Sequence, residues 1–125
     1  MKFPFNQSFS PPMPVLVVTL RNEHKGLSTG SLDALVDTGV DGTVVPAAYL
    51  KDIGAPVIGR ARLHSHLGMR HVILHIADVQ IAELVLPGVV IAADREGKEL
   101  ILGRDVLNHL RLLVDGPAQV TQVHR

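Results

Sequence analysis

The chain has 125 residues, 46% of them hydrophobic, with 12 basic and 12 acidic side chains and no cysteine. This length suits one domain with its own core, and the missing cysteine excludes disulfides, thiolate metal sites and a cysteine nucleophile. A formal net charge of zero without a basic block argues against nucleic acid and anionic membranes as partners. Because no signal-peptide pattern and no run of about 18 apolar residues occur, we expect a soluble, cytoplasmic protein.

The core must be aliphatic, since aromatic residues make up only 3% of the chain. Abundant β-branched residues, punctuated by 11 glycines and 8 prolines, favour a mostly β domain. Residues 1–14 hold four prolines and three phenylalanines, and they predict a tail or a docking arm. The domain proper is expected over residues 15–125.

The first half of that domain predicts three strands and a short helical turn. The strands are expected at 15–20, 31–36 and 43–45, with a polar turn at 21–30 and a helical turn at 47–53. Alternating residues then predict a hairpin of two strands, 57–63 and 69–76, around a tip that ends in Gly68.

The second half predicts further short strands and one short C-terminal helix. The strands are expected at 78–86, 89–93, 99–102, 112–114 and 119–123, with turns at 87–88, 94–98 and 115–117 and the helix at 106–110. Many short strands with closely spaced turn signals indicate a closed, β-barrel-like all-β domain.

Asp37-Thr38-Gly39 follows directly on the apolar run that ends at Val36. This pattern is typical of a strand that delivers a carboxylate to a loop, where the glycine lets the backbone turn and lets a ligand approach closely. An aspartate in this position is also a common turn former. The tripeptide alone does not decide between these two interpretations.

A second motif, Leu100-Ile101-Leu102-Gly103-Arg104-Asp105, precedes the expected helix. With Asp-Thr-Gly upstream and a hairpin between, the chain resembles the retropepsins, the retroviral-type aspartic proteases, over roughly residues 15–115. It looks like a bacterial-type, stand-alone, single-domain member. The resemblance implies the acid-protease barrel, with a flap hairpin at about 57–76.

The resemblance also implies roles for individual residues. Asp37 would be the catalytic aspartate, Thr38 would brace the loop across a dimer, and Gly39 would present its carbonyl to substrate. Asp41 would hold Arg104 in an ion pair. The substrate-binding residues implied are Gly39, Val40, Asp41, His66, Leu67 and Gly68.

Val40 departs from the pattern, because alanine or serine is usual at that position. The extra methyl groups are expected to face the substrate groove and to narrow it beside Asp37.

A single Asp-Thr-Gly implies a homodimer. Aspartic-protease chemistry needs two carboxylates around one water, one ionised and one protonated, because like charges this close cannot both ionise. A twofold axis would supply the second Asp37, and the groove would take an extended peptide or protein substrate. No metal or cofactor is needed. The alternative is a non-catalytic dimeric module that binds peptides or acts as a scaffold.

Four histidines in the expected hairpin allow a second interpretation, a metal site: His64, His66, His71 and His75. Imidazole is a common metal ligand, but no pattern supplies a complete ligand set. We therefore interpret these histidines as a polar surface and expect no metal.

Overall fold

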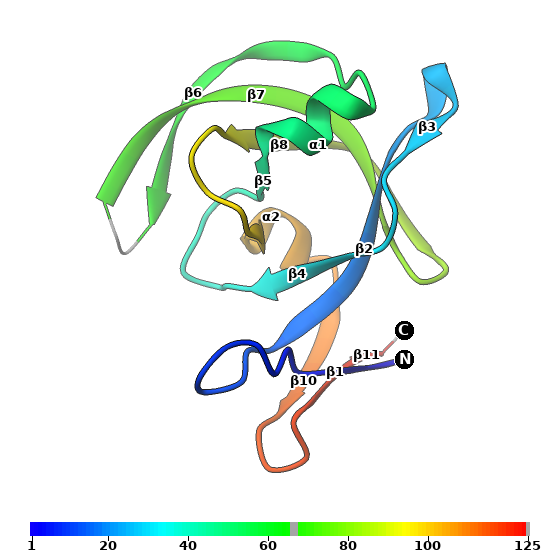
Figure 1. Ribbon diagram of the computed structural model, residues 1–125, viewed down its shortest axis with the longest axis vertical. Helices are drawn as coiled ribbons and strands as arrows, with labels where there is room; N and C mark the ends of the chain where they lie inside the picture. The colour runs from blue at the N-terminus through cyan, green and yellow to red at the C-terminus, as the bar shows by residue number, and fades with distance from the viewer. Residues whose placement is uncertain (66–67, 125) are drawn as a thin grey trace.

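The computed structural model describes residues 1–65 and 68–124 (Figure 1). Its elements in chain order are β1 (Lys2–Pro4), β2 (Val15–Asn22), the 3-10 helix η1 (Glu23–Lys25), β3 (Leu27–Ser28), β4 (Leu32–Val36), β5 (Val44–Pro46), α1 (Ala47–Asp52), β6 (Val57–Ser65), β7 (Gly68–Ile81), β8 (Leu84–Asp94), β9 (Leu100–Leu102), α2 (Arg104–Leu107), β10 (Arg111–Asp115) and β11 (Val120–His124). Within these residues, no helix has the length and apolar character that crossing a membrane requires.

The larger sheet closes on itself into a barrel. Its strands follow the order β3-β2-β4-β9-β5-β8-β7-β6, and an additional pairing of β2 with β7 closes a ring of six strands. The ring encloses an aliphatic core, in which Leu16, Leu20, Ile81, Ile91 and Leu102 are fully buried. The all-β fold, its closed barrel and its short C-terminal helix, α2, are therefore confirmed.

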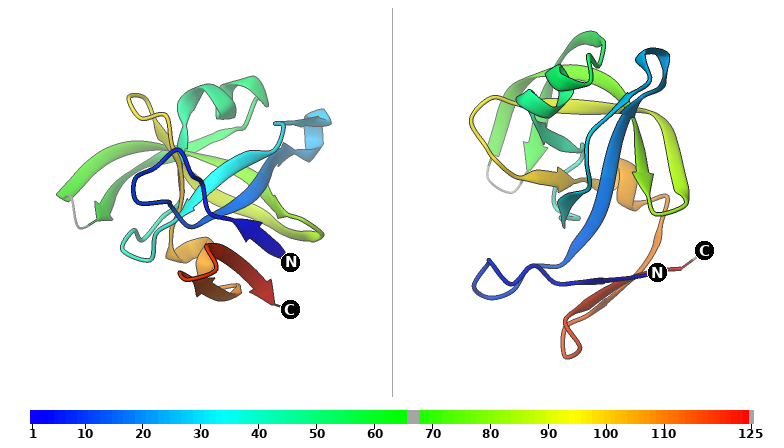
Figure 2. Two further views of the ribbon diagram at one scale, coloured as in Figure 1. Left: turned by 60° about the horizontal axis from the view of Figure 1, so that its bottom comes forward. Right: turned by 45° about the vertical axis from the view of Figure 1, so that its right-hand side comes forward.

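A separate three-stranded sheet, β1-β11-β10, lies below the barrel and brings the two ends of the chain together (Figure 2). Residues 2–4, expected in a tail or arm, form β1 and pair with β11. Phe3 packs against the main core and Phe5 is only 8% exposed. The N-terminal segment is thus docked on its own chain.

The turn expected at 87–88 is wrong, as is the single strand expected over 78–86. The chain reverses between β7 and β8 at Ala82, which has φ of +50°, and β8 continues through Gly88. Gly88 has φ of +62°, and its N–H donates to Asp78 Oδ1 at 2.9 Å, close to the register shift between β7 and β8. The glycine therefore accommodates a bulge rather than a turn.

Thr121 on β11 carries an unsatisfied buried hydroxyl. The residue is 0% exposed, and its Oγ1 has no hydrogen-bond partner in the described parts of the chain. Burying such a group costs about 1–3 kcal/mol. We therefore expect Thr121→Val to raise the free energy of unfolding by about 1 kcal/mol in urea titrations.

Thr29→Val is the matched comparison for this prediction. Thr29 Oγ1 accepts from the N–H of Leu20 at 3.0 Å and donates to the carbonyl of Gly30 at 2.8 Å. Its replacement should lower stability instead. A loss of stability in Thr121→Val would show that the buried hydroxyl has a partner in solution.

Candidate active site

The two sequence motifs meet because β4 and β9 pair in parallel. Their register places Val36 beside Leu102, so both strands end at the same edge. The N–H of Asp37 donates to the carbonyl of Leu102 at 3.2 Å. The loop that begins at Asp37 therefore lies directly against the start of α2 (Figure 1).

The carboxylate of Asp37 is held by its own loop. Asp37 Oδ1 accepts from the N–H of Gly39 at 2.9 Å, which makes the aspartate turn-forming as well as a candidate acid. Asp37 is partly exposed, and Thr38 and Gly39 lie on the same open stretch of the loop. The loop thus presents an oriented carboxylate at an open surface, where a ligand or a second chain has access to it.

Arg104 braces this loop, but through a different partner than expected. Its Nη1 donates to the carbonyl of Thr38 at 2.7 Å, and its N–H donates to the carbonyl of Val40 at 2.9 Å. Asp41 and Arg104 are both exposed, and no ion pair joins them in the part of the chain that the structure describes. The expected ion pair is replaced by bonds to main-chain carbonyls, because α2 begins directly beside the loop.

The strongest link between the two motifs uses Thr43 and Asp105, to which the sequence interpretation gave no role. The N–H and Oγ1 of Thr43 donate to the two carboxylate oxygens of Asp105 at 3.1 and 2.7 Å. Thr43 Oγ1 also accepts from the N–H of Gly103 at 3.2 Å, and Thr43 is 0% exposed. No residue spacing pairs these two side chains. Thr43 directly precedes β5, and the antiparallel pairing of β5 with β9, in which Val44 lies opposite Ile101, brings it beside the start of α2.

Val40 does not face an open groove in the single chain, which corrects the sequence expectation. It is 4% exposed and belongs to a second apolar cluster with Val44, Val72 and Ala92. This cluster packs against residues of the hairpin β6–β7, including Leu63. The larger side chain at position 40 therefore fills space beneath the hairpin, and its role in substrate binding stays a prediction.

The hairpin expected at about 57–76 is formed by β6 and β7, and it extends further along β7 than expected. Gly68 starts β7 with φ of +114°, whereas His66 and Leu67 lie outside the described residues. The hairpin approaches the candidate loop closely, since the N–H of Asp41 donates to the carbonyl of His64 at 3.5 Å.

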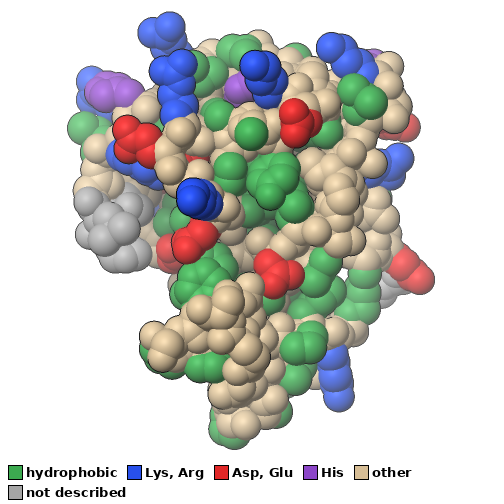
Figure 3. Space-filling model, viewed as in Figure 1, with side chains coloured by type: hydrophobic (Ala, Val, Ile, Leu, Met, Phe, Trp, Pro, Cys, Tyr) green, Lys and Arg blue, Asp and Glu red, His purple; other side chains and the backbone are tan. Residues whose placement is uncertain are grey.

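Among the described residues of the hairpin, His64, His71 and His75 form no metal-binding group. His71 is exposed, and His75 Nδ1 lies 2.9 Å from the carbonyl oxygen of Ala55. Across residues 1–65 and 68–124, no three metal-ligating side chains come close enough to share an ion. Basic side chains gather instead over the upper part of the molecule, where the hairpin and α1 lie (Figure 3).

No protein-family model matches the chain, and no curated protein matches it. Solved structures do match, two of them being proteins with a retroviral-type protease fold. The EIAV protease, complexed with the inhibitor HBY-793, matches with a TM-score of 0.58 and 18% identity, covering 78% of this chain and 86% of its own. The retroviral protease-like domain of Ddi1 from Leishmania major matches with a TM-score of 0.57 and 17% identity, covering 90% and 89%. The chain therefore has the retropepsin-like fold of these proteases.

Proposed function

We propose that the chain is an aspartic endopeptidase that acts as a homodimer. The observation that carries this proposal is the carboxylate of Asp37, held by the N–H of Gly39 at a partly exposed loop of a retropepsin-like fold. Residues of α2 hold the loop through the bonds of Arg104 to Thr38 and of Asp105 to Thr43. The carboxylate is therefore oriented before any ligand binds. Preorganisation of this kind is what acid–base catalysis requires.

In the proposed dimer, the two Asp37 carboxylates share one proton across the twofold axis. The ionised Asp37 accepts a proton from water as the water oxygen bonds to the scissile carbonyl carbon. The protonated Asp37 gives its proton to the carbonyl oxygen. The resulting diol then collapses: one of its hydroxyl groups gives its proton to the Asp37 that is now ionised, the C–N bond breaks, and the leaving nitrogen takes the proton held by the other Asp37. Water is consumed, one peptide bond is hydrolysed and the pair again shares one proton.

The proposed groove runs between the loop and the hairpin. Gly39 and Asp41 are exposed on the loop side, and Gly68 begins the strand on the hairpin side. An extended peptide lying between them would bond to both backbones. We include Val40, His66 and Leu67 among the proposed substrate contacts.

Strand β10 offers the edge at which the second chain would pair. It ends the sheet β1-β11-β10, so one side of it has no neighbouring strand in the described chain. Leu113 and Val114 on this strand are 48% and 47% exposed. An apolar free edge favours pairing with another strand, and β10 follows directly on α2, which braces the Asp37 loop.

We expect Leu113→Cys to form a disulfide-linked dimer. Antiparallel pairing of two β10 strands about a twofold axis brings equivalent central residues to Cα separations of about 4.5–5.5 Å, within disulfide range. The chain has no other cysteine, so non-reducing gel electrophoresis reads the result directly. If the twofold axis passes through residue 114 of β10 instead of residue 113, Val114→Cys should form the disulfide. Val85→Cys, at a residue 39% exposed on β8, is the control and should stay monomeric on the gel.

The proposed activity is tested by incubating the purified dimer with a mixed peptide library from about pH 3 to pH 8. Cleavage that a pepstatin-type inhibitor blocks would support the proposal. A chain that stays monomeric under all conditions would overturn the mechanism, since one Asp37 has no partner.

A second candidate function is a non-catalytic dimeric module that binds extended peptides or serves as a scaffold. The packing of Val40 inside an apolar cluster favours it, because this fills space near Asp37. If a verified dimer binds peptides but does not cleave them, the non-catalytic module is the correct function.

A further inference from the structure

A cavity of about 710 Å³ lies between the hairpin β6–β7 and the end of β8 with the loop that follows it. The hairpin wall carries positive or titratable groups, namely Arg60, Arg70, His71 and His75. The opposite wall carries Asp94, Arg95 and Glu96. None of the residues Asp37 to Gly42 lines this cavity, so it is separate from the candidate loop.

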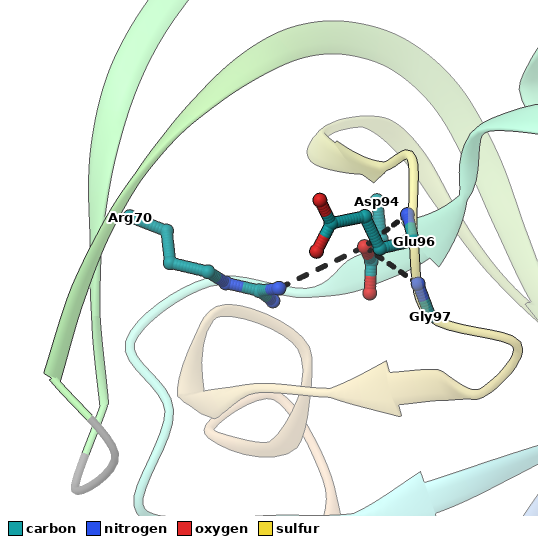
Figure 4. A network of polar contacts seen from close by, with 4 residues as sticks. All are labelled: Arg70, Asp94, Glu96 and Gly97. Carbon is teal, nitrogen blue, oxygen red and sulfur yellow. Dashed lines mark hydrogen bonds and ion pairs between the residues drawn. The ribbon is translucent and has the colours of Figure 1, made fainter.

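On the wall opposite the hairpin, Asp94 is held in place by hydrogen bonds to the backbone. Its side chain is only 9% exposed, and its Oδ1 accepts from the N–H groups of Glu96 at 3.0 Å and Gly97 at 2.9 Å (Figure 4). Burial raises the pKa of Asp94, but those N–H groups and the charge of Arg70 outweigh it and hold the pKa below the ordinary 3.8. Asp94 is therefore a fixed anion at neutral pH.

Arg70 reaches this anion from the hairpin. Its Nη1 lies 3.7 Å from Asp94 Oδ1, in the one ion pair found among the described residues (Figure 4). Arg70 and Val72 lie on the same strand, β7, and Val72 packs in the cluster that contains Val40. The pair thus joins the hairpin to the loop after β8 across the cavity.

We propose that the Arg70–Asp94 pair is a latch that holds the hairpin against the loop after β8 and keeps Val72 packed over Val40. Both residues act as positioning residues. Only the effect of the latch on peptide cleavage rests on the proposed function, in which the hairpin covers bound peptide. The latch itself is a property of the fold and can be measured without any substrate.

The size of the effect follows from the exposure of the pair. Arg70 is 55% exposed, so solvent screens the attraction, and loss of the pair should increase the opening of the hairpin about two- to fivefold. Acid should have the same effect, because protonation of Asp94 removes its charge once the pH falls through its lowered pKa, which lies below the ordinary 3.8. The other titratable or charged groups facing Asp94 across or along the cavity are Arg60, His71, His75, Arg95 and Glu96.

A single engineered thiol can report the opening, since the chain has no cysteine. Val72→Cys places the thiol on β7 of the hairpin, at a position that is 9% exposed and packed in the cluster with Val40. Its rate of labelling by 4,4′-dithiodipyridine, which reacts in acid as well as at neutral pH, is compared in variants. We expect an increase of about two- to fivefold with Arg70→Gln or Asp94→Asn, and no further increase when the two are combined.

Two features of this design separate the latch from general damage. The amide oxygen introduced by Asp94→Asn can still accept both backbone N–H groups, so this variant removes the charge and keeps the turn. Arg60→Gln removes an arginine that lines the same cavity but has no ion pair in the described structure, and it should leave the rate unchanged. As the pH falls through the lowered pKa of Asp94, the labelling rate of the parent should rise toward that of Asp94→Asn, with each rate divided by that of a free thiol at the same pH.

Hydrogen exchange of the Asp41 amide gives the same readout in the cysteine-free chain, because this amide donates to the carbonyl of His64 across the contact between loop and hairpin. Equal rates in Arg70→Gln, Asp94→Asn and the parent by both measurements would overturn the latch, as would an equal increase in Arg60→Gln. These outcomes do not depend on cleavage. If the chain cleaves peptides, the latch variants should raise KM more than they lower kcat.

Discussion

Asp37→Asn should abolish peptide hydrolysis, lowering kcat by roughly 10³- to 10⁴-fold or more. An amide cannot take a proton from water or return one to the carbonyl oxygen, and the substitution removes both members of the proposed pair at once. The structure of the loop should survive, because the amide oxygen of asparagine can still accept from the N–H of Gly39. The measurement is kcat on a peptide found in the library, together with the oligomeric state of the variant.

Asp52→Asn is the matched control, since Asp52 is an exposed acid on α1 and should leave kcat unchanged. Mixing equal amounts of parent and Asp37→Asn tests the pairing itself. If active dimers need two carboxylates and chains exchange freely, the mixture should show about a quarter of the activity of parent alone at the same total chain concentration, because random pairing makes about that share of the dimers parent–parent. About one half of that activity would show that each chain acts alone and would contradict the proposed mechanism.

The parts of the site that sequence reasoning placed correctly are those set by strand ends. An apolar run that stops at Asp37 and another that stops at Leu102 mark two strands whose ends carry polar loops, and the structure pairs them in parallel. The family resemblance supplied the expectation that these loops belong together. Short apolar strands with closely spaced turn signals predicted the barrel, and β2 shows the pattern best, since it buries alternate side chains along most of its length.

The parts that were wrong or missed depend on which groups face each other in three dimensions. Asp41 and Arg104 looked like partners by analogy, yet the guanidinium group finds the carbonyl of Thr38 instead. Thr43 and Asp105 carry the actual link, and neither has a sequence signal that names the other. A main-chain carbonyl is present at every residue, so the sequence does not indicate which one an arginine will bind. The bond from Arg104 to Thr38 was therefore not predictable.

The turn between β7 and β8 failed for a related reason. Pro87-Gly88 is a strong turn signal, but a glycine at positive φ serves a bulge as readily as a turn. Ala82 adopts a positive φ although alanine has no preference for that conformation, so the sequence does not indicate the turn there. The long pairing of β7 with β8, which continues on both sides of Gly88, decides the outcome over the local signal.

Gly103→Ala should lower the free energy of unfolding by about 3 kcal/mol and reduce any peptidase activity. A Cβ at position 103 would lie 2.6 Å from the carbonyl carbon of Gly42, 2.7 Å from its oxygen and 3.0 Å from the carbonyl oxygen of Val40. All three are backbone atoms, so no side chain can rotate away, and the Asp37 loop must separate from α2. Forcing extra atoms into a packed site typically costs about 1–3 kcal/mol.

The backbone angles of Gly103 make this effect purely steric. Its φ of −90° and ψ of −177° are open to any residue, so alanine meets no conformational penalty there and would even restrict the unfolded chain. Gly116→Ala is the control, because a Cβ at Gly116 meets no atom within 4 Å. This control should change stability by less than about 0.5 kcal/mol. Urea titration of both variants measures the difference. If Gly103→Ala were as stable as Gly116→Ala, the loop and α2 would not be packed as tightly as the link between Thr43 and Asp105 requires.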